Sequence, residues 1–93
     1  MNFSRVAAQR AQSDDGSIVE VLDRQTVRYR DADLSATIDV DFAATTGIYV
    51  ESLQAQSAEG RSLLLESDQR ATLLSRIEAG LASLGVETER CER

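Results

Sequence analysis

The sequence predicts an α+β fold in which an antiparallel sheet carries one amphipathic helix on one of its faces. Residues 34–42 alternate between apolar and polar side chains, which is the period of a half-buried strand. Residues 68–84 place Leu and Ile at helical spacing, so that one stripe of the predicted helix is apolar. One apolar stripe and one apolar sheet face favour a two-layer sandwich. We therefore expect a meander of about four strands, then the helix, then a short edge strand.

The first half of the chain supplies most of the predicted strands. Residues 2–12 show weak helical spacing before a cluster of turn formers, so residues 1–15 are predicted to be a loosely packed arm or a short helix. Residues 17–23 are rich in β-branched side chains, and residues 25–30 alternate, which predicts two strands. Residues 34–42 follow as the third strand, with Leu34 to Phe42 alternating toward the core.

The second half of the chain supplies a fourth strand, the helix and the edge strand. Residues 48–53 are predicted to be a strand, residues 54–62 a polar loop, and residues 86–90 an edge strand. Ser67 or Asp68 is suited to begin the helix as its N-cap, and Gly85 is suited to end it in a left-handed conformation. Gly80, inside the helix, costs about 1 kcal/mol relative to Ala and allows a close approach to the sheet. No repeat or linker divides the chain, so residues 1–93 are predicted to form a single domain.

The composition excludes several kinds of chemistry. The 93 residues include no His and a single Cys, and all ten basic residues are Arg. A Ser-His-Asp or Cys-His site, an imidazole-ligated metal, a Schiff-base lysine and an internal disulfide therefore cannot be built. We expect no catalytic site, no cofactor and no metal ion, and a protein that works by binding.

The charge and hydropathy indicate the kind of partner. The net charge of −6 disfavours nucleic acid and anionic membranes and favours a basic protein surface, although plain solubility explains the same charge. No segment approaches the roughly 20 apolar residues of a membrane span. The N-terminal segment lacks the apolar stretch of a secretory signal, so a cytoplasmic location is predicted.

Acidic side chains in the strand region are the candidate binding residues. Asp39 and Asp41 share one face of a predicted strand, roughly 7 Å apart. Such a pair can hold a cation or act in acid–base chemistry, but it is more typical of a solvated face or of partner binding. Arg28 and Arg30 can clamp a carboxylate or phosphate, but pairing across the sheet with Asp39 or Asp41 is favoured if the two strands are neighbours in register. The predicted partner-binding residues are Asp31, Asp33, Asp39, Asp41, Tyr49 and Glu51.

About four-fifths of the chain resembles a bacterial family in the order of its features. The matching segments are Thr26–Asp31, Phe42 with Ile48–Leu53, Arg70–Ile77, and Leu81, Leu84 and Gly85–Glu89. This pattern is similar to the immunity protein 74 family of bacterial polymorphic toxin systems. The loop at residues 54–62 lacks an expected aromatic and Pro-rich stretch, and the N-terminal arm has no counterpart. The resemblance implies a cytoplasmic inhibitor that binds a cognate toxin and needs no catalytic residues.

Two functions from different classes follow. The first is an immunity protein that binds a toxin or effector domain, steered by the acidic residues, with Tyr49 as a hot spot if it is exposed. The alternative is a small homodimeric accessory domain, such as a secretion chaperone-like protein, that buries an edge strand or sheet face against a second copy. An enzyme is the least favoured class.

Overall fold

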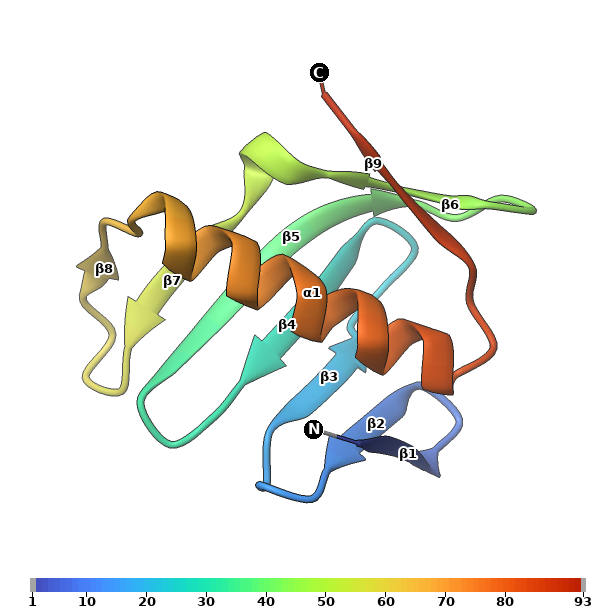
Figure 1. Ribbon diagram of the computed structural model, residues 1–93, viewed down its shortest axis with the longest axis horizontal. Coiled ribbons are helices and arrows are strands. Elements are labelled where there is room, and N and C mark those ends of the chain that lie inside the picture. The colour runs from blue at the N-terminus through green and yellow to red at the C-terminus, as the bar shows by residue number, and fades with distance from the viewer. Residues whose placement is uncertain (1, 93) are drawn as a thin grey trace.

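The computed structural model describes residues 2–92 and confirms the predicted α+β class, with one helix packed on a mostly antiparallel sheet (Figure 1). The helix is α1 (Ser67–Ser83), and no helix among the described residues is long and apolar enough to cross a membrane. The strands are β1 (Phe3–Ala7), β2 (Arg10–Ser13), β3 (Ile18–Val21), β4 (Thr26–Arg30), β5 (Leu34–Asp41), β6 (Thr46–Tyr49), β7 (Gln54–Ser57), β8 (Ser62–Leu63) and β9 (Thr88–Cys91). A single 3-10 turn, η1 (Val50–Ser52), lies between β6 and β7.

The predicted meander is present as β3, β4, β5 and β6, which are neighbours in the sheet and antiparallel to one another. The alternation of β5 holds along its length: Ala36, Ile38 and Val40 are buried, whereas the residues between them are half-buried. The strand ends at Asp41, one residue before the predicted end. Phe42 therefore lies outside the alternation and stays 37% exposed.

The structure contradicts the predicted N-terminal helix. Residues 3–13 form β1 and β2, an antiparallel hairpin that continues the sheet beyond β3. Ala11 and Ser13 of β2 are buried. A short helix of this weakly apolar sequence would have little packing to stabilise it. As strands, the same residues satisfy their backbone hydrogen bonds by pairing with each other and with β3.

The predicted strand at residues 48–53 and the predicted loop at residues 54–62 are also corrected. The chain forms β6, turns through η1, and then pairs again as β7 with the first half of β5. The two-residue strand β8 pairs with β7 at this edge of the sheet. At the interruption the Ser52 hydroxyl accepts a hydrogen bond from the Asp39 N–H (2.8 Å) and donates one to the Tyr49 carbonyl (2.6 Å). Ser52 thus links β5 to the turn where strand pairing is broken.

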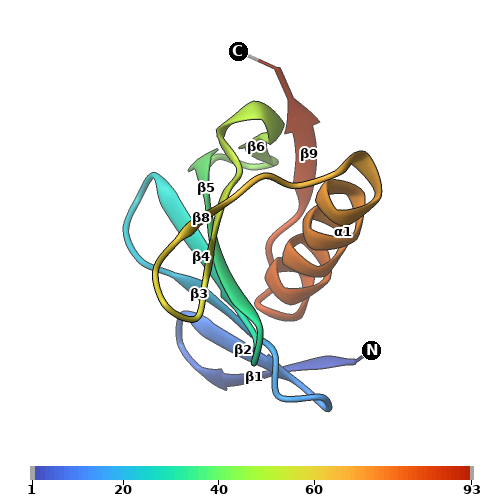
Figure 2. The same cartoon turned by 90° about the vertical axis from the view of Figure 1, so that its left-hand side faces the viewer.

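The helix covers one face of the sheet and leaves the other open (Figure 2). It begins at Ser67, and its N-cap is Glu66 rather than the predicted Ser67 or Asp68; the Glu66 N–H donates to the Gln69 side chain (2.9 Å). It ends as predicted before Gly85, which has a positive φ of 82°. The last residues of the helix are tied to the following loop by a hydrogen bond from the Val86 N–H to the Leu81 carbonyl (3.0 Å).

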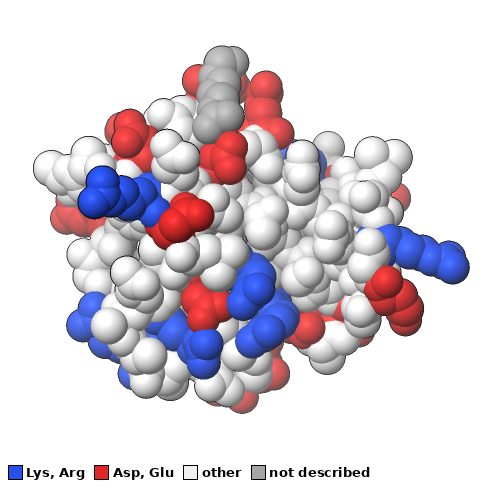
Figure 3. Space-filling view, turned by 180° about the vertical axis from the view of Figure 1, so that it is seen from behind, with Lys and Arg blue, Asp and Glu red and all other residues white. Residues whose placement is uncertain are grey.

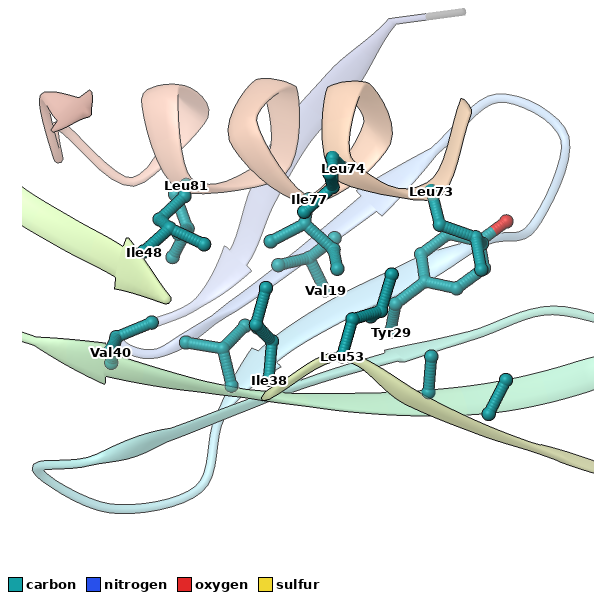
Figure 4. Close-up of a cluster of buried hydrophobic side chains, with 13 residues drawn as sticks. Val19, Tyr29, Ile38, Val40, Ile48, Leu53, Leu73, Leu74, Ile77 and Leu81 are labelled. Atoms are coloured by element: carbon teal, nitrogen blue, oxygen red, sulfur yellow. The ribbon is translucent and has the colours of Figure 1, made fainter. Parts of the chain in front are cut away.

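The core lies between the helix and the sheet (Figure 4). Leu73, Leu74, Ile77 and Leu81 point from the helix toward buried side chains of the sheet, and Ile77 and Leu81 are fully buried. Gly80 faces Val19 so closely that a Cβ on the glycine would lie 2.5 Å from the Cβ of Val19. The close approach predicted for Gly80 is therefore confirmed.

The final strand is a short edge strand, as predicted, although it covers residues 88–91 rather than 86–90. It runs parallel to β6, with Thr46 opposite Thr88 and Tyr49 opposite Cys91. A connection through α1 allows this parallel pairing, because the chain must cross over the sheet between the two strands. An ion pair between Arg90 and Glu78 (2.8 Å) joins the strand to the helix.

Candidate protein-binding surface

The face of the sheet opposite the helix is open and carries polar side chains. On β5 the side chains that alternate with the buried ones point to this face: Ser35, Thr37, Asp39 and Asp41. The view from behind shows most of the arginine side chains in its lower half and acidic side chains near its top (Figure 3). The alternation of buried and solvated side chains along β5 is typical of an antiparallel sheet that packs against a helix on one face and contacts water on the other.

Three of the six predicted binding residues converge on this face. Asp39, Asp41 and Tyr49 line a shallow depression of about 240 Å³ together with Gln25, Thr26 and Val40. The strand register explains the convergence, because Thr26 lies opposite Asp39 and β6 pairs with the end of β5. Tyr49 is half-buried rather than fully exposed.

Glu51 extends this acidic region, whereas Asp31 and Asp33 do not. Glu51 is exposed in η1, which directly follows Tyr49. Asp31 and Asp33 lie in the turn between β4 and β5, at the opposite end of β5 from Asp41. The eight residues of β5 separate the two ends by roughly 25 Å. The six predicted residues therefore form two groups and not one patch.

Asp31 has a structural task at its end of the sheet. Its carboxylate accepts hydrogen bonds from the N–H groups of Asp33 (2.8 Å) and Leu34 (3.0 Å) and from the Tyr29 hydroxyl (2.7 Å). Burial raises the pKa of Asp31, but these hydrogen bonds and the charge of Arg76 outweigh it, so the pKa lies below its usual value. Because its oxygens are committed to the turn and to Tyr29, we leave Asp31 out of the binding surface.

Tyr29 is the centre of a polar cluster that sequence reasoning missed. Its ring is fully buried, and its hydroxyl contacts the Ser17 hydroxyl (3.2 Å) and accepts a hydrogen bond from Arg76 of α1 (2.6 Å). The guanidinium carbon of Arg76 also lies 6.0 Å from the ring centroid, within reach of a cation–π contact. The alternation of residues 25–30 indicated that Tyr29 points inward, but nothing in the sequence indicated its partners.

This cluster acts as a clamp that holds the helix to the sheet, and Tyr29 in it is not a nucleophile. Burial is the main cause that raises the pKa of Tyr29, so its hydroxyl stays neutral near pH 7. The hydrogen bond from Arg76 to Tyr29 is the main cause that raises the pKa of Arg76. A neutral phenol that donates to Asp31 and accepts from Arg76 fixes the helix to the end of β4.

The register does not place Arg28 and Arg30 directly opposite Asp39 and Asp41, which is the arrangement that the sequence predicted. In the register of β4 and β5, Arg28 lies opposite Thr37 and Arg30 opposite Ser35. Arg28 instead pairs with Glu20 of β3 (2.5 Å). Direct pairing with Asp39 or Asp41 would need a longer connection between the two strands than the short turn at residues 31–33 makes.

Glu20 is shared by two arginines on this face. Arg10 of β2 donates two hydrogen bonds to it, the shorter at 2.6 Å, and Arg28 donates a third. The hydrogen bonds from Arg10 and then Arg28 hold the pKa of Glu20 below its ordinary value. With Arg30 nearby on β4, the part of the face over β2–β4 carries more arginines than carboxylates. The open face is therefore basic over β2–β4 and acidic around the depression.

No group of three or more acidic or Cys side chains among residues 2–92 is arranged to hold a metal ion. The chain shows no significant match to a known protein family, a curated protein or a solved structure. The likeness to the immunity protein 74 family thus stays a prediction, and the functional argument depends on the geometry of the open face.

Proposed function

We propose that this protein is a non-catalytic binding module that docks on a partner protein through the open face of its sheet. The observation that carries the proposal is the convergence of Asp39, Asp41 and Tyr49 on one depression in a sheet face that the helix leaves uncovered. Two carboxylates beside an aromatic ring form an environment suited to a cationic side chain.

A basic side chain of the partner is the expected occupant of the depression. An Arg or Lys head placed there donates charge-assisted hydrogen bonds to the carboxylates of Asp39 and Asp41. The ring of Tyr49 adds a cation–π contact, which is worth about 0.5–2 kcal/mol depending on how far the site is desolvated. The polar side chains of Gln25 and Thr26 complete the wall of the depression.

The division of charge on the open face favours one orientation of the partner. The net charge of −6 and the exposed Glu51 attract a basic surface from a distance and raise the association rate. The arginines over β2–β4 repel the same basic surface and attract carboxylates. A partner with the matching division of charge docks in one register, because a reversed orientation would place like charges together.

We propose further that the partner is a bacterial toxin or effector domain, which this protein neutralises in the cytoplasm by covering its functional surface. The sequence resemblance to immunity proteins supports this identity of the partner. A domain that inhibits by coverage needs a rigid, chemically specific surface, and a sheet face buttressed by a helix provides one.

The test is binding and protection with the product of the adjacent gene. Purified protein is titrated with that product by calorimetry, and both are co-expressed to measure survival. The double variant Asp39→Asn/Asp41→Asn removes two charges from the depression and is expected to weaken binding at least about tenfold. The matched control Asp33→Asn/Glu59→Gln removes two exposed charges outside the depression and is expected to change the affinity by less than about threefold.

Three results would contradict the proposal. The first is that the adjacent gene product does not bind and co-expression gives no protection. The second is that both double variants weaken binding equally, and the third is that only the control variant weakens it. Equal weakening would show that net charge and not the depression determines affinity. An effect of the control alone would place the interface at the opposite end of β5.

A homodimeric accessory domain is the second candidate. The large apolar side chains that remain exposed at the two ends of the helix favour self-association. Light scattering combined with the partner titration separates the candidates, because a stable two-fold dimer that buries the open face would not bind the partner, whereas self-association through other surfaces leaves the open face available.

A further inference from the structure

Apart from Val6 of β1, the exposed large apolar side chains of residues 2–92 gather at the two ends of α1. At its N-terminal end Leu64 is 98% exposed and Leu63 is 38% exposed, and we call these two residues the leucine knob. At its C-terminal end Leu22 and Phe42 are exposed beside the loop that follows the helix. The 17 residues of the helix separate the two ends by about 25 Å, so the knob of one molecule cannot reach its own far end.

A groove of about 610 Å³ lies at the C-terminal end of the helix. Its apolar lining comes from β3 and three chain connections: Val21, Leu22, Phe42, Leu84 and Val86. The three connections join β3 to β4, β5 to β6 and α1 to β9, and Figure 1 shows them on the right-hand side of the molecule. The groove is within the size range of roughly 300–1,000 Å³ that holds organic ligands, so it has room for leucine side chains.

Arginines stand at the rim of this groove. Arg5 donates hydrogen bonds to the carbonyls of Ala8 (3.3 Å) and Leu84 (3.4 Å), which fixes its guanidinium beside the end of the helix. Arg24 is exposed, and within residues 2–92 it forms no ion pair. The carboxylate of Asp23, the third charged residue at the rim, accepts a hydrogen bond from the Gln25 N–H (2.8 Å). The rim therefore carries a net positive charge.

The surroundings of the leucine knob have the opposite charge. Glu66 lies two residues after the knob and Asp68 lies in the first turn of the helix, while Glu59 and Arg61 precede the knob. Arg70 of α1 also lies beside the knob, so three carboxylates against two guanidiniums give this end a net negative charge. An apolar knob with an acidic border thus matches an apolar groove with a basic rim on the other end of the same chain.

We propose that the leucine knob of one copy inserts into the groove of a second copy, in a head-to-tail contact. Because the two surfaces differ, the contact is heterologous, and each copy keeps one free knob or one free groove after the first contact. Association therefore continues into short chains or closes into a ring. The contact uses surfaces other than the depression, so it does not depend on the proposed binding of a basic partner.

The test uses complementary variants of the full chain. Leu64→Asp disables the knob and Leu22→Asp disables the groove, and both positions are exposed enough that folding is expected to survive. If Leu22→Asp does not give a cooperative thermal transition, Arg24→Glu replaces it. Gln12→Asp, at an exposed position on β2, controls for the added negative charge. Masses are measured by sedimentation and light scattering up to about 1 mM protein.

The proposal predicts a distinct pattern of masses. Wild type and Gln12→Asp rise above the monomer mass as concentration increases, each disabled variant associates at least about tenfold more weakly, and an equimolar mixture of the two forms a one-to-one dimer. The mixture restores one contact only, because it contains one intact knob facing one intact groove. A wild type that stays monomeric, disabled variants that associate like wild type, or a mixture that stays monomeric would each overturn the proposal.

Discussion

Replacing Gly80 by Ala tests how closely the helix packs on the sheet. The added methyl would lie 2.5 Å from the Cβ of Val19 and closer still to its Cγ2. Val19 is fully buried on β3 and its branched side chain is stiff, so the helix or the strand must move. Overpacking of this kind costs about 1–3 kcal/mol, and the upper end applies because the Cβ itself is in the way.

The helix propensity of Ala opposes this cost by about 1 kcal/mol. The expected net loss in the free energy of unfolding is therefore about 2 kcal/mol, which lowers the melting temperature by roughly 8–16 °C in a domain of this size. Urea unfolding followed by circular dichroism measures the change. The double variant Val19→Ala/Gly80→Ala should lose less stability than the sum of the two single losses, because Val19→Ala removes Cγ2, the atom nearest to the new methyl, together with Cγ1.

A control at an exposed position of the same helix isolates the propensity. Ala79→Gly should cost about 1 kcal/mol, because only helix propensity changes there. The reasoning is refuted if Gly80→Ala is as stable as wild type or more stable, or if Val19→Ala and Gly80→Ala destabilise additively.

Two further predictions concern the polar groups at the end of the sheet. Tyr29→Phe should lower the free energy of unfolding by about 1–3 kcal/mol, because Arg76 and Asp31 lose a buried partner; a urea midpoint equal to that of wild type would contradict the clamp. Hydrogen bonds from the hydroxyl of Ser13 and then from the N–H and hydroxyl of Ser17 lower the pKa of Asp15 from 3.8 to about 2. Since the folded-state pKa is the lower one, the stabilisation is present above pH 3.8 and is lost as the pH falls toward 2. Urea midpoints measured between about pH 5 and pH 2 should therefore fall less steeply for Asp15→Asn than for wild type, and identical slopes would contradict this assignment.

The elements with a strong period were predicted well from the sequence. Residues 34–41 and the helix each place large aliphatic side chains at a single period, and burial of those side chains determines the local structure. Gly80 and Gly85 were interpreted correctly because few residues other than glycine allow a close approach of a helix to a sheet or a positive φ. These features depend on short-range patterns that a sequence displays directly.

The elements that failed are those whose structure depends on a partner strand. Residues 3–13 and 54–57 contain few large apolar side chains, and their strands exist because β3 and β5 supply hydrogen-bond partners. Periodicity carries no information on such pairing. The turn between β1 and β2 also lacks the Gly or Asn that usually marks a tight hairpin.

The candidate site was predicted only in part for the same reason. Asp39 and Asp41 were placed on one face because they share a strand, but the approach of Tyr49 depends on the register between β5 and β6. Asp31 was grouped with them by charge alone. Its hydrogen bonds to Tyr29 and to the turn come from tertiary packing, which composition and spacing do not reveal.

The most direct test of the proposed binding surface is a map of amide chemical shifts. The labelled protein is titrated with the product of the adjacent gene, and the shifts are followed residue by residue. The account predicts that the largest changes fall on Thr26, Asp39, Asp41 and Tyr49, around the depression in the open sheet face. Changes confined to the solvent face of α1 or to the leucine knob, with the depression unaffected, would contradict it.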